Sequence, residues 1–377
     1  MHTATRQIRM SAPDIQDEDV ELVSQVLRSG SLSMGSFVQR FERAFADYIG
    51  TSTAVAVSSG TAGLHLCVSA AGIGAGDEVV TTPFSFVAST NCILYERATP
   101  VLVDIEWDSM NIDPRLAAAA VTERTRAMIP VHIFGRPCAL DALAAVCRAR
   151  DIVMFEDACE ALGAEFQGRK VGGFGTAGVF GFYPNKQITT GEGGLVTTND
   201  MAFAAKLRSL RNQGRDEMGT WLFHEHLGFN YRLDEMSAAL GLSQLQRIDT
   251  LLERRRKAAA TYAALLVELP GVTLVPQADR AARLSWFVLV VRLDERISRD
   301  GVVEHLSRHG IPTRAYFPPI HLQPYMKERF GYREGDFPVT ERVARSTLAL
   351  PFHTNIPDSD IEYVVRHLKT AVDRSAA

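Results

Sequence analysis

The chain has 377 residues, and its 40 lysines and arginines against 44 aspartates and glutamates give a formal net charge of −4. The length allows one large α/β domain with a smaller second one, and a hydrophobic share of 46% supplies a sizeable core. Nucleic-acid binding is not expected, because phosphate neutralisation needs a basic surface. Apolar stretches are too short for a membrane span, and the N-terminus lacks a signal-peptide core, so we expect a cytoplasmic protein that does not enter membranes.

Two helices are expected first, over residues 17–29 and 36–49, separated by a turn at 30–35. An alternation of short apolar strands and helices then begins, which is typical of a parallel sheet with crossover helices. Seven strands are predicted, over residues 54–57, 78–82, 99–104, 126–131, 152–156, 177–182 and 194–197. The intervening helices are predicted over 61–71, 86–96, 114–121 and 139–150. This pattern predicts one large, doubly wound, mostly parallel α/β domain.

The remainder of the chain predicts a smaller α+β domain. Helices are expected over 200–211 and 233–268, and the second carries the chain out of the large domain. Strands at 285–292 and 312–315 and helices at 299–309 and 358–372 follow. The Pro-rich stretch 316–321 is expected to be an irregular loop. We therefore predict a large domain over 1–250, including an N-terminal helical segment 1–50, and a small domain over 251–377.

Cysteine and histidine spacing indicates neither disulfides nor a metal site. The cysteines form no C-x-x-C pair, and their odd number in a cytoplasmic protein indicates free thiols: Cys67, Cys92, Cys138, Cys147 and Cys159. His224 and His226 flank Glu225, but nothing nearby completes a ligand set. No metal is expected.

Several unusual residues follow predicted strands, and ligands of open α/β sheets bind at the carboxyl ends of strands. The run from Ser58 to Ala62 follows a strand and opens a helix, where Gly60 allows close approach and free amides suit a phosphate. The same Ser-Gly-Thr pattern is also a common helix N-cap without a ligand. Phe86 follows another strand and could stack on a flat ring, although a single aromatic residue at a helix start is more often core.

Asp157 and Lys186 suggest a more specific chemistry. Asp157 follows the fifth strand, where a carboxylate could cap a helix or pair with a protonated ring nitrogen. Lys186 lies between the sixth strand and a turn rich in glycine, surroundings that suit a Schiff-base lysine more than a solvated one. A phosphate turn, a stacking ring, a strand-end Asp and this Lys together supply the contacts that pyridoxal phosphate (PLP) needs.

With these motifs, the sequence resembles the DegT/DnrJ/EryC1/StrS sugar aminotransferases of the fold type I, aspartate aminotransferase-like superfamily. The resemblance covers residues 30–50, 58–63, 82–89, 130–143, 156–163, 180–197, 208–214, 228–246 and 318–321. It implies that Lys186 forms the Schiff base with PLP and moves the proton, and that Asp157 keeps the pyridine nitrogen protonated. It also implies that Gly60 and Thr61 bind the phosphate and that Phe86 stacks on the ring. Asn230 would reach the phosphate from a neighbouring subunit, which makes a homodimer part of the active site.

Two positions depart from the family pattern. Gly181 stands where the family commonly has a serine that donates to the phosphate, so another group must replace that hydroxyl. Glu160 stands where Gln or His usually approaches the 3′-oxygen of the cofactor, and a carboxylate there would be repelled unless protonated or turned away. Glu160 is nevertheless included among the expected cofactor-binding residues.

The resemblance implies a two-stage transamination, in which L-glutamate donates an amine that then passes to a nucleotide-linked keto-sugar, such as a 4-keto-6-deoxy or 3-keto sugar. Substrate contacts are expected from the 30–35 turn, residues 208–214 and the 314–325 loop. Relatives that act on cyclitols or make aminobenzoate precursors remain an alternative. Related sugar dehydratases carry His where Lys186 stands, and a cofactor-binding regulator would need a basic patch or a helix-turn-helix that the sequence lacks.

Overall fold

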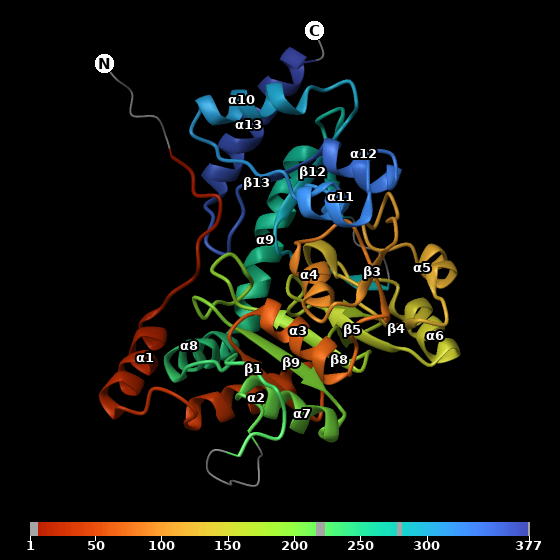
Figure 1. Cartoon of the computed structure of the whole chain (residues 1–377). Helices are drawn as coiled ribbons and strands as arrows, with labels where there is room; N and C mark the ends of the chain where they lie inside the picture. Colours follow the sequence, from red (N-terminus) through yellow and green to blue (C-terminus); the bar gives the residue numbers. More distant parts are fainter. Residues whose placement is uncertain (1–6, 216–222, 277–280, 376–377) are drawn as a thin grey trace.

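A seven-stranded sheet forms the centre of the computed structural model, which describes residues 7–215, 223–276 and 281–375 (Figure 1). Its strand order is β1-β9-β8-β5-β4-β2-β3. The pairs β8–β5, β5–β4, β4–β2 and β2–β3 are parallel, and β9 is antiparallel to both β1 and β8. The strands are β1 Thr53–Val57, β2 Glu78–Thr81, β3 Thr99–Leu102, β4 Thr125–Met128, β5 Val153–Asp157, β8 Ala177–Gly181 and β9 Gly194–Thr198. The predicted mostly parallel sheet is confirmed, with strand ends shifted by a few residues.

Helices cover both faces of this sheet because its strands are apolar on both sides. One core cluster joins the sheet to α2 (Ser36–Ile49), α5 (Pro114–Ala120), α6 (Leu140–Arg150) and α8 (Glu235–Gln246). A second cluster joins the opposite face to α3 (Gly60–Ala70), α4 (Ala88–Tyr95) and α7 (Met201–Arg211). Burial on both faces is typical of a doubly wound α/β sheet.

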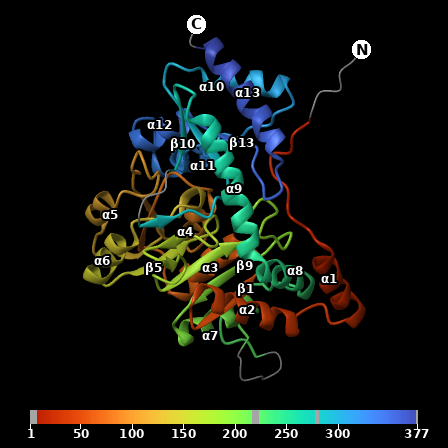
Figure 2. The same cartoon turned by 180° about the vertical axis from the view of Figure 1, so that it is seen from behind.

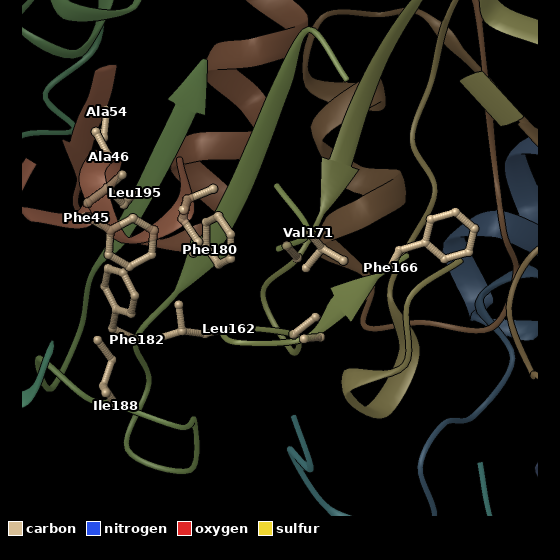
Figure 3. Packing of buried hydrophobic residues seen from close by; sticks show 14 of the residues in the cluster. Phe45, Ala46, Ala54, Leu162, Phe166, Val171, Phe180, Phe182, Ile188 and Leu195 are labelled. Carbon is tan, nitrogen blue, oxygen red and sulfur yellow. The ribbon is translucent and has the colours of Figure 1, made fainter. Parts of the chain in front are cut away.

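Aromatic packing fixes the segment that follows β8. The Phe45 ring lies 5.0 Å from Phe180 and 5.6 Å from Phe182, measured between ring centroids. Figure 3 shows these rings together, with Ile188 beyond Phe182. Phe182 and Ile188 are both buried, so the short turn between them is held at both ends.

The predicted long helix over 233–268 is wrong in one respect: it is two helices, α8 and α9 (Ile248–Leu266). The backbone leaves the helical region at Arg247, with φ −116° and ψ 17°. The Arg247 guanidinium forms ion pairs with Asp14, which precedes α1 (Asp17–Ser29), and with Asp19, which lies in the first turn of α1. The residue at the break is therefore also a contact with a distant part of the chain.

The C-terminal part contains a three-stranded antiparallel sheet, β10 (Val272–Val275), β12 (Leu289–Leu293) and β13 (Thr347–Leu350). Its helices are α10 (Arg299–Arg308), α11 (Pro324–Phe330), α12 (Pro338–Ser346) and α13 (Asp358–Ser375). Figure 2 shows α9 running from the seven-stranded sheet to this part. A separate small sheet has β6 (Glu165–Phe166) of the large region at its centre, paired with β7 (Arg169–Lys170) on one side and with β11 (Ala282–Arg283) on the other.

Sequence reasoning was less accurate in the C-terminal part. The strand predicted over 285–292 begins only at Leu289, and the one predicted over 312–315 is an isolated bridge between Arg314 and Ala349. The Pro-rich loop is not wholly irregular, since a 3₁₀ turn spans Ile320–Leu322. The division into 1–250 and 251–377 remains a proposal, and residues 1–6 of the predicted N-terminal segment lie outside the described residues. Within the described ranges, no helix is both long and apolar enough to cross a membrane.

Candidate active site

A cavity of about 510 Å³ lies at the carboxyl ends of the parallel strands. Six of the residues predicted from the sequence line it: Gly60, Thr61, Phe86, Asp157, Glu160 and Lys186. They come from the ends of β1, β2, β5 and β8, which the strand order brings to one edge of the sheet. The parallel topology therefore joins residues that are far apart in the sequence.

The start of α3 forms one wall of the cavity. Ser59 is its N-cap, and its Oγ accepts a hydrogen bond from the Ala62 amide at 3.1 Å. The first amides of a helix have no partner within it, and Gly60 and Thr61 both line the cavity. A Cβ added at Gly60 would come within 2.7 Å of Cys159 Sγ. The N-cap and the phosphate-binding interpretations are thus compatible. A glycine is required at position 60 because Cys159 Sγ lies too close to where a Cβ would be.

Asp157 ends β5 and is buried at the base of the cavity. Its Oδ2 accepts a hydrogen bond from Ser89 Oγ at 2.7 Å, and its Oδ1 accepts one from the Cys159 amide at 3.2 Å. The helix-capping alternative is wrong, because residues 158–164 form turns and not a helix. Ser89 was missed from the sequence, since a serine on a helix carries no signal until α4 is seen packing beside β5.

Lys186 lies in the turn after β8, where its amide donates to the Tyr183 carbonyl at 2.9 Å. Its side chain is 14% exposed, and its Nζ lies 3.9 Å from Glu160 Oε1. The same Nζ lies 3.9 Å from the centroid of the Phe287 ring, in a cation–π arrangement. The amine is therefore held inside the cavity between a carboxyl group and an aromatic ring.

Glu160 is buried, and its Oε2 accepts a hydrogen bond from the Phe134 amide at 2.8 Å. Burial raises the pKa of this carboxyl to about 7, although Lys186 and the Phe134 amide act in the opposite direction. Phe134 has φ 55°, a left-handed conformation that is strained for a bulky residue. A carboxyl group with this pKa is protonated in a substantial fraction of molecules at neutral pH, which is one of the two conditions that the sequence analysis set for this position.

The space at Gly181 accommodates a side chain. A Cβ added there would lie 3.6 Å from Cys159 Cβ and Sγ, which is ordinary van der Waals contact. The hydroxyl groups of Ser59 and Thr61 belong to residues that line the same cavity. They are candidates to replace the absent serine hydroxyl.

Phe86 lies on the cavity wall and is 60% exposed, so the core interpretation of this ring is wrong. It also does not open a helix, because α4 begins only at Ala88. Residues of the C-terminal part complete the cavity, and sequence reasoning missed Phe287, whose segment precedes β12. Tyr316 and Phe317 also line it, so the 314–325 loop reaches the cavity, and its contact with the substrate stays a prediction.

Three predicted segments do not line the cavity of their own chain. The 30–35 turn and residues 208–214 are absent from its lining. Asn230 is exposed and forms a bridge with Asn212 away from the cavity. The cavity of a single chain therefore does not account for their predicted roles.

Comparisons with known proteins agree with this arrangement. The family model described as the DegT/DnrJ/EryC1/StrS aminotransferase family matches residues 13–369. The chain is 37% identical to the spore coat polysaccharide biosynthesis protein SpsC of Bacillus subtilis over 375 residues, 96% of each chain. It is 38% identical to GDP-perosamine synthase of Caulobacter vibrioides over 364 residues, 96% of this chain and 97% of the relative.

A solved structure shows the same fold. It is that of S. venezuelae DesV in complex with a ketimine intermediate, with a TM-score of 0.92 and 34% sequence identity. The alignment covers 98% of this chain and 100% of DesV. The chain therefore belongs to the DegT/DnrJ/EryC1/StrS family of PLP-dependent sugar aminotransferases.

Proposed function

We propose that this enzyme transfers the amino group of L-glutamate to a nucleotide-linked keto-sugar, with PLP held in the cavity described above. The observation that carries the proposal is that Lys186, the Asp157 carboxylate and the N-terminus of α3 face one cavity. The relative named GDP-perosamine synthase supports a nucleotide-linked sugar as the acceptor. Lys186, rather than the His of related dehydratases, supports transamination.

The donor set suits the cofactor. The α3 amides of Gly60 and Thr61 would hold the phosphate, and Asp157 would hold a proton on the ring nitrogen. Phe86 would cover one face of the ring, and Glu160, protonated, could donate a hydrogen bond to its 3′-oxygen. When bound, PLP supplies an electron sink for negative charge at the reacting carbon.

The protein residues divide the remaining work. Lys186 Nζ, held inside the cavity, would act as the general acid and base that moves a proton to and from the substrate. Ser89 orients the Asp157 carboxylate through the 2.7 Å hydrogen bond, so the charge stays directed at the cavity. Phe287 and Phe317 exclude water from the amine and from the cavity wall.

We also propose a homodimer in which Asn230 of each subunit completes the site of the other. Leu227 is 93% exposed on the same loop as Asn230, and Phe223 on that loop is also exposed. Phe86 and Tyr183, at the cavity, are exposed apolar or aromatic residues as well. Exposed apolar residues gathered on a loop and a cavity rim support an interface there. A cytoplasmic location accords with five cysteines that remain free thiols.

The acceptor and the donor are tested by an amine-transfer assay. Purified holoenzyme is incubated with ¹⁵N-labelled L-glutamate and a GDP-linked 4-keto-6-deoxy sugar, and the product is analysed by mass spectrometry. We expect a labelled amino sugar and one equivalent of 2-oxoglutarate. Transfer to a keto-cyclitol but not to the nucleotide sugar would instead support the cyclitol alternative, and label from glutamine alone would overturn the donor.

The shared site is tested by subunit complementation. Lys186→Ala and Asn230→Asp chains are each expected to be nearly inactive, the second because an added carboxylate repels the phosphate. Mixed dimers would hold one site with both defects and one intact site. Random mixing should therefore restore about one quarter of wild-type activity. Absence of any recovery in dimers that are shown to be mixed would contradict the shared site.

A further inference from the structure

Three histidine side chains gather between α10 and α13, at the end of the molecule away from the seven-stranded sheet (Figure 1). They are His305, His309 and His367, and one potential ligand atom of each lies within 4.8 Å of those of the other two. His305 and His309 are one turn apart on or just after α10, so they share a helix face. His367 comes from α13, which packs against α10.

The rings are close enough to act together. The ring centroids of His305 and His309 lie 4.4 Å apart, and those of His309 and His367 lie 4.1 Å apart. None of these residues belongs to the cavity described above. Sequence spacing did not indicate the cluster, because His367 is separated from the other two by β13 and two helices.

Two ring nitrogens in this cluster are buried without a hydrogen-bond partner among the described residues: His305 Nε2 and His367 Nδ1. His305 is only 9% exposed, so water does not readily satisfy its nitrogen. Leaving a buried polar atom unpaired costs roughly 1–3 kcal/mol in general, and such atoms in native proteins call for an explanation. A bound cation would satisfy both nitrogens at once.

The third histidine is already oriented for ligation. His309 Nδ1 lies 2.7 Å from the His305 carbonyl oxygen, to which it can only donate. This hydrogen bond leaves the Nε2 lone pair of His309 available. A backbone carbonyl that fixes the tautomer of a ligating histidine is the usual second layer of a metal site.

The charges around the cluster favour neutral rings. Burial first, and then the nearby His309, Arg374 and Arg308, lower the pKa of His305. Burial first, and then His309, Arg366 and His305, lower the pKa of His367. Neutral imidazole is the form of histidine that ligates a metal.

We propose that His305, His309 and His367 form a binding site for Zn²⁺, with water in the fourth position. Zn–N distances of about 2.0–2.1 Å in a tetrahedron place the nitrogens about 3.3 Å apart, so modest side-chain rotation converts the observed cluster into a ligand set. The metal would join α10 to α13 and stabilise the C-terminal part. This inference is independent of the proposed reaction, because no residue of the cavity takes part in it.

The test uses the PLP-loaded enzyme and its variants after removal of bound metal. Each protein competes for Zn²⁺ with a chromophoric chelator in a titration at pH 7.5. We expect one Zn²⁺ per chain, and at least roughly 100-fold weaker binding in His309→Gln and in His367→Gln, since each loses one of three ligands. These two residues are half-buried and are therefore safer to replace than His305. His224→Gln, an exposed histidine on a different loop, should bind like the wild type.

Two further readouts separate a ligand from a structural role. Co²⁺ should give the intense visible absorption of four-coordinate cobalt in the wild type and lose it in His309→Gln. Zn²⁺ should raise the unfolding temperature of the wild type and not that of the variants, while the variants retain the wild-type circular dichroism spectrum. Wild-type binding that is weaker than millimolar, or variants that bind Zn²⁺ as tightly as the wild type, would overturn the proposal.

Discussion

Lys186 lies in a cavity whose polar groups come from the ends of adjacent strands, whereas the three histidines come from two helices packed side by side. In the cavity, nearly every charged group is paired: Asp157 with Ser89, and Glu160 with Phe134 and Lys186. In the histidine cluster, two buried nitrogens have no partner within the part of the chain that the structure describes. A functional site can therefore be recognised in two ways. In one, polar side chains from several elements converge and pair with one another; in the other, buried polar atoms lack a hydrogen-bond partner.

Residues 285–287 connect the cavity to the C-terminal part of the chain. Gln187 Nε2 donates to Ser285 Oγ at 2.9 Å and to the Glu160 carbonyl at 2.7 Å. Arg255, buried on α9, donates to the carbonyls of Trp286 and Phe287, both at 2.8 Å. The C-terminal part therefore sets the position of the Phe287 ring against Lys186.

The largest expected effect is that of Lys186→Ala on turnover. Removing the general acid and base should lower the amine-transfer rate by at least about 10⁴-fold, equivalent to roughly 5.5 kcal/mol in the barrier. The Zn²⁺-dependent rise in unfolding temperature should be unchanged, because α10 and α13 are far from the cavity. Steady-state kinetics and thermal unfolding measure the two effects, with Lys206→Ala on α7 as the control lysine. Substantial residual turnover would contradict the role of Lys186.

Arg255→Met should have the next largest effect, on stability. The buried guanidinium also donates to Thr354 Oγ1 at 3.1 Å, so its loss leaves three acceptors unsatisfied. We expect a decrease of about 3 kcal/mol in the free energy of unfolding, measured by urea titration. The neighbouring Arg256→Met removes only an exposed ion pair with Glu253 and should cost less than about 1 kcal/mol. Equal losses in the two variants would argue against the connecting role of Arg255.

Glu160→Gln should change how the stability of the cofactor-free protein depends on pH. The pKa of Glu160 is raised to about 7 in the folded protein, above the value near 4.3 of an unfolded chain. Between these values the folded chain binds more protons, so the wild type loses stability as the pH rises. The stability of the variant relative to the wild type should therefore increase by about 3 kcal/mol between pH 4 and pH 8. A difference that stays constant across this range would show that Glu160 titrates normally.

Gly181→Ser should give the smallest effect, and in the opposite direction. The space beside Cys159 admits a side chain, and a new hydroxyl could donate to the phosphate. We expect PLP to bind roughly fivefold more tightly, equivalent to about 1 kcal/mol, in a fluorescence titration of the cofactor-free protein. Gly60→Ser is the matched comparison, and it should weaken binding, because its Cβ would clash with Cys159 Sγ. Weaker binding in Gly181→Ser would place the phosphate elsewhere.

The large sheet could be predicted because its strands are short apolar runs that end in polar or glycine residues. β1, for example, is buried throughout and leads directly into Ser59 and Gly60. The C-terminal part offered weaker signals. β13 follows α12 without a turn residue, and β10 is only half-buried along its middle. The break at Arg247 has no Pro or Gly signal in the sequence, and the ion pairs of Arg247 with Asp14 and Asp19 join residues that are far apart in the chain.

The same distinction applies to the candidate site. Gly60, Asp157 and Lys186 were found because each lies in a short motif at a strand end. Ser89, Phe287 and the three histidines were missed because their roles arise from contacts between elements that are distant in the sequence. Their residue types are unremarkable until the chain has folded.

The central claim is that this cavity holds PLP and accepts an amine from L-glutamate. The most direct test is the absorption spectrum of the purified protein, recorded before and after addition of L-glutamate. We expect a yellow visible band that bleaches to a near-ultraviolet band when the amine is transferred. A yellow band that L-glutamate leaves unchanged would contradict the donor, and a colourless protein that takes up no added PLP would contradict the claim itself.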